Sequence, residues 1–136
     1  RISVHDDWFK AAERQFGFDW RLIAAISYQE SRFDPKAKSF AGAQGLLQVM
    51  PRTARSMGFK KLSRPEDGIH AGVKYLDWVR NRFEDTLPFS ERMWFSLAAY
   101  NAGPGQVKKA GGVPRINETK RYIKRVLSYY DRYAKA

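Results

Sequence analysis

Glu30 is the side chain in this sequence whose type and spacing best suit acid–base chemistry. It follows Ile26 by four residues and Ile23 by seven, so on a continuous helix it extends an apolar stripe. Desolvation at such a position penalises the charged carboxylate and favours a protonated acid, as proton donation near neutral pH requires. The alternative for an isolated glutamate is a solvated helix end paired with Arg32 or another basic residue. Periodicity alone leaves both interpretations open.

The elements that must position Glu30 are predicted to be helices. Apolar residues recur at spacings of three, four and seven between Gly and Pro breaks. The predicted helices run over about 8–16, 20–34, 51–57, 65–84, 90–102 and 117–133.

The ends of these helices carry recognisable signals. We expect Gly17 to stop the first helix, Asp19 to cap the second and Pro35 to end it. Pro51 suits the first turn of the short helix, which Gly58 closes.

The later helices have similar signals. We expect Ser90 and Asn117 to cap the starts of the last two helices, and Gly103-Pro104-Gly105 to end the first of these after Asn101. A short hairpin within 37–44 or 111–116 is the one strand feature compatible with the pattern. The predicted fold is therefore mainly α.

Composition limits the class of protein. The 136 residues, 43% of them apolar, are enough for one domain over 1–136, and a start at Arg1 indicates a piece of a longer protein. A formal charge of +11 favours an anionic partner. There is no cysteine and no run of about 20 apolar residues, so we expect neither thiol chemistry nor a membrane span.

Several separated motifs follow Glu30 in a fixed order. They are Glu30-Ser31, then Ser39 and Gly42, then Gly45-Leu46-Leu47-Gln48 with Met50-Pro51, then Ala99-Tyr100-Asn101-Ala102-Gly103. In order and spacing the chain resembles the lytic transglycosylases of the soluble lytic transglycosylase type, glycoside hydrolase family 23. The resemblance covers about Phe18 to Tyr130. Parts of it are closest to the membrane-bound F-type branch.

This resemblance implies a lysozyme-like fold, shared with goose-type lysozymes, with a glycan cleft. It makes Glu30 the catalytic acid and base. The implied substrate-binding residues along the cleft are Ser39, Gln48, Met50, Tyr100, Asn101 and Glu118, the last from the motif Glu118-Thr119. One departure is Leu47, where the family usually has Met; the similar volume should repack without changing the chemistry.

Each implied binding residue also has a purely structural interpretation. Tyr100 would be a core aromatic, Asn101 and Gln48 would satisfy backbone groups, and Met50 would fill the core. Glu118, next to the expected cap Asn117, would be favoured by the helix dipole alone.

The reaction that the resemblance implies needs a single carboxyl group. Ordinary glycosidases use two, but Asp34 is better suited to capping a turn before Pro35, and the distance to Glu118 cannot be read from sequence. In the implied route Glu30 acts as acid and then as base, and the product is a 1,6-anhydro-N-acetylmuramic acid end. Attack by water instead would make the chain a lysozyme-like hydrolase.

The expected partner is the glycan strand of peptidoglycan, in the periplasm or cell envelope, with any membrane anchor in a segment outside this sequence. We expect no cofactor and no metal, since His5 and His70 lack partners at metal-ligand spacing. We also expect no nucleic acid and no membrane contact by this domain. The rival classes are a basic nucleic-acid-binding module, without a recognised DNA-binding pattern, and a catalytically dead wall-binding domain. The sequence does not define the oligomeric state.

Overall fold

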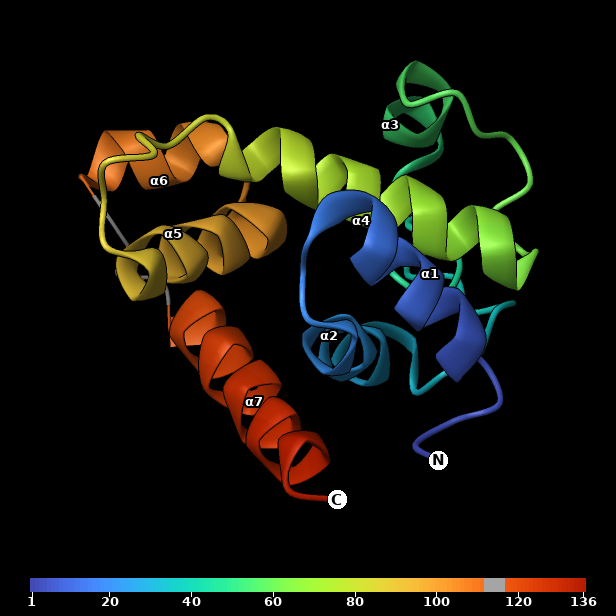
Figure 1. Ribbon diagram of the computed structural model, residues 1–136. Helices are drawn as coiled ribbons and strands as arrows, with labels where there is room; N and C mark the ends of the chain where they lie inside the picture. The colour runs from blue at the N-terminus through green and yellow to red at the C-terminus, as the bar shows by residue number, and fades with distance from the viewer. Residues whose placement is uncertain (112–116) are drawn as a thin grey trace. The chain divides into compact units, whose positions relative to one another are not determined.

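The computed structural model describes residues 1–111 and 117–136, and the regular secondary structure of these residues is helical (Figure 1). The helices are α1 (Asp6–Phe16), α2 (Trp20–Ser31), α3 (Pro51–Ser56), α4 (Pro65–Arg80), α5 (Phe89–Ala102), α6 (Pro104–Ala110) and α7 (Asn117–Ala134). In the described residues the only strand-like pairs are two isolated antiparallel bridges, Lys38 with Gln44 and Gln44 with Val49. The mainly α prediction is confirmed. The hairpin predicted within 37–44 is present only as the isolated bridge between Lys38 and Gln44. Most of the alternative hairpin, predicted within 111–116, lies outside the described residues.

The chain divides into two compact units. The first unit comprises Arg1–Tyr75 and Val126–Ala136, and the second comprises Leu76–Arg125. Helices α4 and α7 therefore each supply residues to both. The prediction of one domain over 1–136 stays a prediction. Among the described helices, none is long and apolar enough to cross a membrane.

In the first unit α1 packs against α2, and the residues between them set the two helix ends. Gly17 adopts φ 80° and its N–H donates to the Glu13 carbonyl, which ends α1 as predicted. Asp19 caps α2 through Oδ1, which accepts from the Arg21 N–H at 3.0 Å. Its other oxygen, Oδ2, accepts from the Tyr130 hydroxyl at 2.9 Å. One carboxylate thus fixes the start of α2 and joins it to the end of α7.

The end of α2 differs from the prediction. The helix stops at Ser31, three residues before Asp34, because Arg32 and Phe33 adopt the left-handed conformation, with φ of 53° and 65°. Pro35 is not the residue that ends it, and Phe33, within the predicted range 20–34, lies in the turn after the helix. Left-handed backbone costs about 1–2 kcal/mol for each non-glycine residue, so the turn needs compensation from packing.

Aromatic contacts supply that compensation. The Phe33 ring lies 5.4 Å from the Tyr28 ring, 6.3 Å from Phe9 and 6.5 Å from Tyr133, measured between centroids. Tyr28 in turn meets Tyr129 edge-on at 4.8 Å. Aromatic pairs at these separations contribute about 0.5–1.5 kcal/mol each beyond the area they bury. The turn after α2 is therefore held by rings from both ends of the chain.

The predicted Gly-Leu-Leu-Gln segment packs closely on the glycines of α4. A Cβ on Gly68 would lie 2.9 Å from the Leu62 carbonyl oxygen, and one on Gly72 would collide with the Leu47 side chain. Gly45, at φ 84°, is itself pressed against the Leu62 carbonyl. Leu47 is buried, as expected for a residue that repacks in place of methionine. Glycine on both sides lets this segment approach the helix closely.

In the second unit α4 ends earlier than predicted. It stops at Arg80, and the chain turns through bonds from the Arg82 N–H to the Val79 carbonyl and from the Phe83 N–H to the Arg80 carbonyl. The apolar spacing continues to Phe83 because its ring is used elsewhere, 5.8 Å from the Phe95 ring of α5. Phe83 is half-buried, so the apolar spacing here marks a packed side chain that lies beyond the end of the helix.

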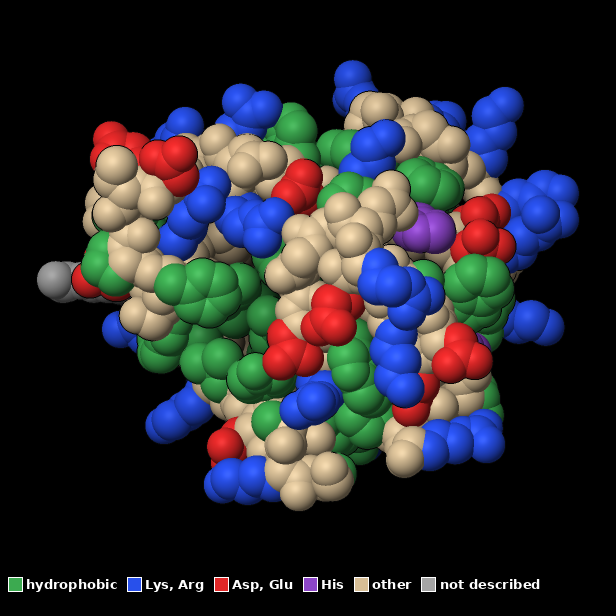
Figure 2. All heavy atoms as spheres, viewed as in Figure 1, with side chains coloured by type: hydrophobic (Ala, Val, Ile, Leu, Met, Phe, Trp, Pro, Cys, Tyr) green, Lys and Arg blue, Asp and Glu red, His purple; other side chains and the backbone are tan. Residues whose placement is uncertain are grey.

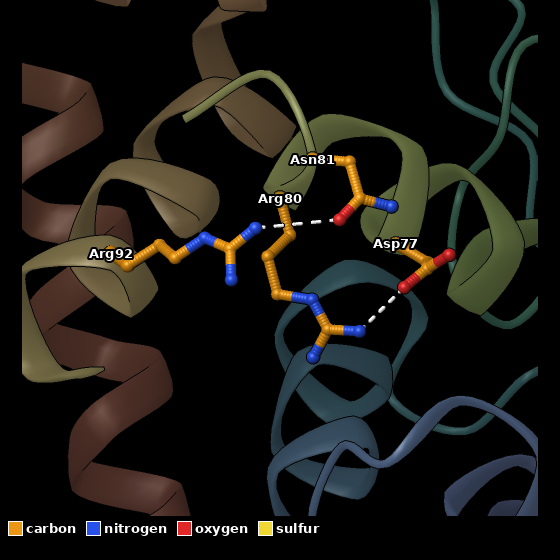
Figure 3. Close-up of polar contacts among 4 residues, drawn as sticks. All are labelled: Asp77, Arg80, Asn81 and Arg92. Carbon is orange, nitrogen blue, oxygen red and sulfur yellow. Dashed lines mark hydrogen bonds and ion pairs between the residues drawn. The ribbon is translucent and has the colours of Figure 1, made fainter. Parts of the chain in front are cut away.

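Polar contacts also join the end of α4 to α5 (Figure 3). Arg80 pairs with Asp77 within α4, and Arg92 of α5 reaches the Asn81 side-chain oxygen at 3.4 Å. The Arg92 Nε is buried and has no hydrogen-bond partner among the described residues.

Helix α6 was not predicted, and its neighbour begins at a different residue than expected. Only Gly103 separates α5 from α6. Pro104 is the first residue of α6, a position where the missing N–H of proline costs no hydrogen bond. Pro88, with extended ψ of 142°, precedes α5 at the cap position. Ser90 lies inside the first turn and is not the cap. Helix α7 begins at Asn117 itself, so Asn117 is the first residue of the helix and not the cap that its sequence predicted.

Candidate functional site

Glu30 lies in the last turn of α2 and is half-buried. The next residue fixes that turn: the buried Ser31 Oγ lies 2.8 Å from the Leu46 carbonyl oxygen and 3.0 Å from the Ser27 carbonyl oxygen. A single hydroxyl proton is shared between these two acceptors. The backbone beside Glu30 is thereby tied to the Gly-Leu-Leu-Gln segment.

Gln48 stands in strained backbone and is bonded to the loop before it. Its φ is 49°, in the left-handed region that non-glycine residues rarely occupy. Its side-chain nitrogen donates to the Ala37 carbonyl at 3.0 Å and to the Gly45 carbonyl at 2.9 Å. Both amide hydrogens are thus used by the backbone, as the structural interpretation expected. The carbonyl oxygen Oε1 is the atom that can accept from a ligand.

Ser39 and Met50 lie at the outer edge of the same loop. Ser39 is exposed, and its Oγ accepts from the Ala43 N–H at 3.0 Å while its own N–H donates to the Ala43 carbonyl at 2.9 Å. Met50 is 43% exposed, which contradicts the interpretation of core filler. Its terminal methyl lies over Gly42, where an added Cβ would meet it at 3.8 Å. The side chains of Ser39 and Met50 therefore both contact the same turn, residues 39–43.

In the second unit Tyr100 and Asn101 occupy the last turn of α5, and both are half-buried. The Asn101 side-chain oxygen accepts from the Thr119 hydroxyl at 2.9 Å. The Asn101 oxygen thus bonds to a side chain of α7 and not to the helix-end backbone that the structural interpretation expected. Thr119 is fully buried, and Glu118 beside it is exposed.

The predicted site residues fall into two groups. The first unit holds Glu30, Ser39, Gln48 and Met50, of which the last three belong to one loop and Glu30 is tied to that loop through Ser31. The second unit holds Tyr100, Asn101 and Glu118. Sequence reasoning missed the supporting hydroxyls of Ser31 and Thr119. Both appear in the quoted motifs, but nothing in a sequence shows that a Ser or Thr is buried with an acceptor.

Asp34 performs the structural role predicted for it. Its Oδ1 accepts from the Lys36 N–H at 2.9 Å, which caps the turn after α2. The carboxylate of Asp34 is therefore used in the turn. In the described residues no group of three or more His, Cys, Asp or Glu side chains could hold a metal ion.

Charge is spread over the surface, with one uneven region. Figure 2 shows Lys and Arg side chains across the whole visible face. Along the sequence, however, no Asp or Glu occurs between Asp34 and Glu66, and this stretch contains the whole loop of the first unit. The loop that holds Ser39, Gln48 and Met50 is therefore locally cationic.

Comparison with known proteins identifies the family. A family model described as the transglycosylase SLT domain matches residues 7–123. The chain belongs to this family. It is 44% identical over 110 residues to the membrane-bound lytic murein transglycosylase F of Alcanivorax borkumensis, an alignment that covers 81% of this chain and 24% of that protein.

Solved structures of SLT-domain proteins agree with the fold. The 70 kDa soluble lytic transglycosylase of Escherichia coli matches 95% of this chain and 24% of its own, with a TM-score of 0.81 and 34% identity. An inactive variant of the Pseudomonas aeruginosa lytic transglycosylase Slt, in which glutamine replaces one glutamate, matches 97% of this chain and 24% of its own, with a TM-score of 0.82 and 31% identity. The mainly α, lysozyme-like fold is thus confirmed. The chain spans about a quarter of the length of each of these relatives.

Proposed function

We propose that this SLT domain cleaves the glycan strands of peptidoglycan between N-acetylmuramic acid and N-acetylglucosamine, with Glu30 as general acid and then base. The observation that carries the proposal is the position of Glu30. Glu30 is a half-buried residue in the last turn of α2, and the Ser31 hydroxyl ties that turn to the loop that holds three further candidate residues. That a Glu-to-Gln exchange gives an inactive variant in the Pseudomonas aeruginosa relative supports a mechanism that depends on one carboxyl group.

In the first step Glu30 donates its proton to the glycosidic oxygen. The bond from that oxygen to C1 of N-acetylmuramic acid breaks, and N-acetylglucosamine leaves with a free 4-hydroxyl. The positive charge that develops at C1 is stabilised by the carbonyl oxygen of the sugar's own acetamido group. No second protein carboxylate is needed.

In the second step the Glu30 carboxylate accepts the proton of the C6 hydroxyl on the same N-acetylmuramic acid. O6 then forms a bond to C1, which gives a 1,6-anhydro end and returns Glu30 to its protonated form. Atoms balance without water. In this scheme Gln48 Oε1, Ser39, Tyr100, Asn101 and Glu118 orient the sugars by hydrogen bonds, and Met50 offers an apolar contact.

This substrate also determines where the protein works. Peptidoglycan lies outside the cytoplasmic membrane, so the proposal includes a location in the periplasm or cell envelope. The Alcanivorax borkumensis relative is described as membrane-bound, which agrees with that location.

The test is digestion of purified peptidoglycan by the wild type and by Glu30→Gln. We expect the wild type to release muropeptides with anhydro ends, identified by mass, and Glu30→Gln to lose activity by at least about a thousandfold, as expected when a general acid that also serves as base is removed. Glu66→Gln, at an exposed position in the first turn of α4, is the matched control and should retain activity.

Other outcomes would contradict parts of the proposal. Reducing ends in place of anhydro ends would mean that water completes the reaction. Binding without release of fragments would mean a wall-binding module. Near-wild-type turnover by Glu30→Gln would remove Glu30 from the mechanism.

A further inference from the structure

The loop of the first unit carries an aromatic side chain that the proposed mechanism does not use. Phe40 is fully exposed, although a phenylalanine ring gains about 1.5–3 kcal/mol from burial. It directly follows Ser39, one of the predicted glycan-binding residues. A single exposed apolar residue needs no explanation by itself, so its surroundings decide its meaning.

The turn that presents Phe40 is held by several backbone bonds. The Gly42 N–H donates to the Ser39 carbonyl at 3.0 Å, and Ser39 and Ala43 are joined in both directions by the bonds described above. One step inward, the Gly45 N–H donates to the Ala37 carbonyl at 2.9 Å. Gly42, the fourth residue of this turn, has φ 101°, and glycine is favoured at that position. The backbone of the turn that carries Phe40 is therefore held in one conformation.

A second exposed apolar side chain belongs to the same surface. The Met50 methyl lies over Gly42 in this turn. Phe40 thus belongs to the turn over which the Met50 methyl lies, and Gln48 is bonded into the same loop through Ala37. Exposed apolar groups beside fixed polar groups are the composition of a binding surface for a ligand with both kinds of face.

The charge of this region indicates an anionic ligand. Between Asp34 and Glu66 there are seven basic residues and no acidic one: Lys36, Lys38, Arg52, Arg55, Lys60, Lys61 and Arg64. Lys36 and Lys38, which precede Phe40, are both exposed. Among the described residues no ion pair involves either of them.

We propose that Phe40 is a substrate-binding residue that stacks on the C–H face of a sugar ring in the peptidoglycan strand, with Lys36 and Lys38 attracting the carboxylates of its stem peptide. This inference rests on the proposed function for the identity of the polymer. A β-1,4-linked pyranose presents axial C–H groups on its faces, which pack on the electron-rich face of an aromatic ring. The position of Phe40 next to Ser39 favours a glycan over an anionic membrane surface.

The test measures binding separately from cleavage. In a Glu30→Gln background, Phe40→Ala should sediment with insoluble peptidoglycan with an affinity about three- to tenfold weaker, as expected for the loss of one aromatic contact. The matched control is Phe89→Ala, since Phe89 is 79% exposed at the start of α5 in the second unit. That variant should bind within about twofold of its parent. Both variants should keep the parent's Tm, because neither ring is buried.

Two further variants separate stacking from general hydrophobicity. Phe40→Trp keeps an aromatic face and should keep the affinity, whereas Phe40→Leu should lose as much as Phe40→Ala. A leucine variant that binds as well as the parent would overturn stacking. Strands freed of stem peptides by an amidase should still show the Phe40→Ala effect but no longer respond to a Lys36→Gln, Lys38→Gln double variant. An effect of Phe40→Ala that disappears on these strands would overturn the sugar contact.

The failure of this inference can be distinguished from the failure of the proposed function. If the wild type releases no fragments but Phe40→Ala still weakens sedimentation, the enzyme proposal fails and Phe40 remains a binding residue. If the wild type cleaves and Phe40→Ala behaves like Phe89→Ala, the inference is overturned. It is also overturned if Phe40→Ala weakens binding to phosphatidylglycerol vesicles and leaves peptidoglycan binding unchanged.

Discussion

The two compact units support their candidate residues with a buried hydroxyl each, but the acceptors differ. In the first unit Ser31 Oγ binds main-chain carbonyls, that of Leu46 above all. In the second unit the Thr119 hydroxyl binds a side chain, the Oδ1 of Asn101. A main-chain acceptor ties a whole loop to the helix that carries Glu30, whereas a side-chain acceptor orients one amide. Changes in the first unit should therefore affect both stability and catalysis, and those in the second should affect mainly substrate binding.

The largest expected effect comes from adding one methyl group to the tied loop. Gly45→Ala places a Cβ against the Leu62 carbonyl in left-handed backbone, so we expect a loss of about 2–4 kcal/mol in the free energy of unfolding, measured by urea denaturation. Gly105→Ala in α6 is the control, because nothing lies within 4 Å of its added Cβ. Equal effects of the two substitutions would contradict the contrast between the units.

The next effect is the loss of the Ser31 hydroxyl. Ser31→Ala leaves the buried Leu46 carbonyl without this donor, which should cost about 1–2 kcal/mol. Because the same bond fixes the turn beside Glu30, kcat on peptidoglycan should fall more than KM changes. A variant with lowered stability and unaltered kcat would show that Ser31 is only structural.

Thr119→Val is the corresponding change in the second unit. It keeps the volume of the buried side chain and removes the donor to Asn101, so we expect a loss of about 1 kcal/mol in stability. The main result should be a higher KM with kcat little changed, measured on the same substrate. A fall in kcat as large as that of Ser31→Ala would remove the distinction between the two hydroxyls.

The first unit was also the more predictable from sequence at three of its helix termini: the end of α1 and the starts of α2 and α3. Gly17, Asp19 and Pro51 act locally, so their roles follow from residue type and position. Family motifs located the candidate residues, and Asp34 was correctly assigned to a turn. These signals need no knowledge of distant residues.

What could not be predicted depends on distant contacts. The cost of the left-handed turn that ends α2 after Ser31 is offset by contacts with the rings of Phe9 and Tyr133. The apolar side chain of Phe83, beyond the end of α4, packs against Phe95 of α5. Helical spacing describes only neighbours along one helix, so it extended both helices too far. Helix α6 was missed because Pro104 can both end one helix and begin another.

The smallest expected effect concerns the bond between Tyr130 and Asp19. This hydrogen bond, followed by burial, raises the pKa of Tyr130 above 10.0. A raised pKa in the folded state means that the stabilisation is complete below pH 10 and is lost as pH rises through the folded value. Tyr130→Phe should therefore be less stable than the wild type by under about 1 kcal/mol below pH 9, since the hydroxyl is partly exposed.

Unfolding free energies measured between pH 8 and pH 11 check this prediction. The difference between wild type and Tyr130→Phe should shrink above pH 10. A difference that stays constant to pH 11 would mean that the bond does not control the ionisation of Tyr130.

The left-handed turn of Arg32 and Phe33 has a consequence for how the protein acquires activity. Tyr28, the nearest of the rings that hold it, belongs to α2, but Phe9 and Tyr133 come from α1 and from the last turn of α7. The turn therefore gains its full set of contacts only when α1 and α7 have been made and brought together. Such non-local contacts form late in folding. During synthesis the turn that follows Glu30 should thus lack part of its packing until α7 has been made. A chain that ends before Tyr133 would contain every candidate residue, but the turn that follows Glu30 would lack its contact with α7.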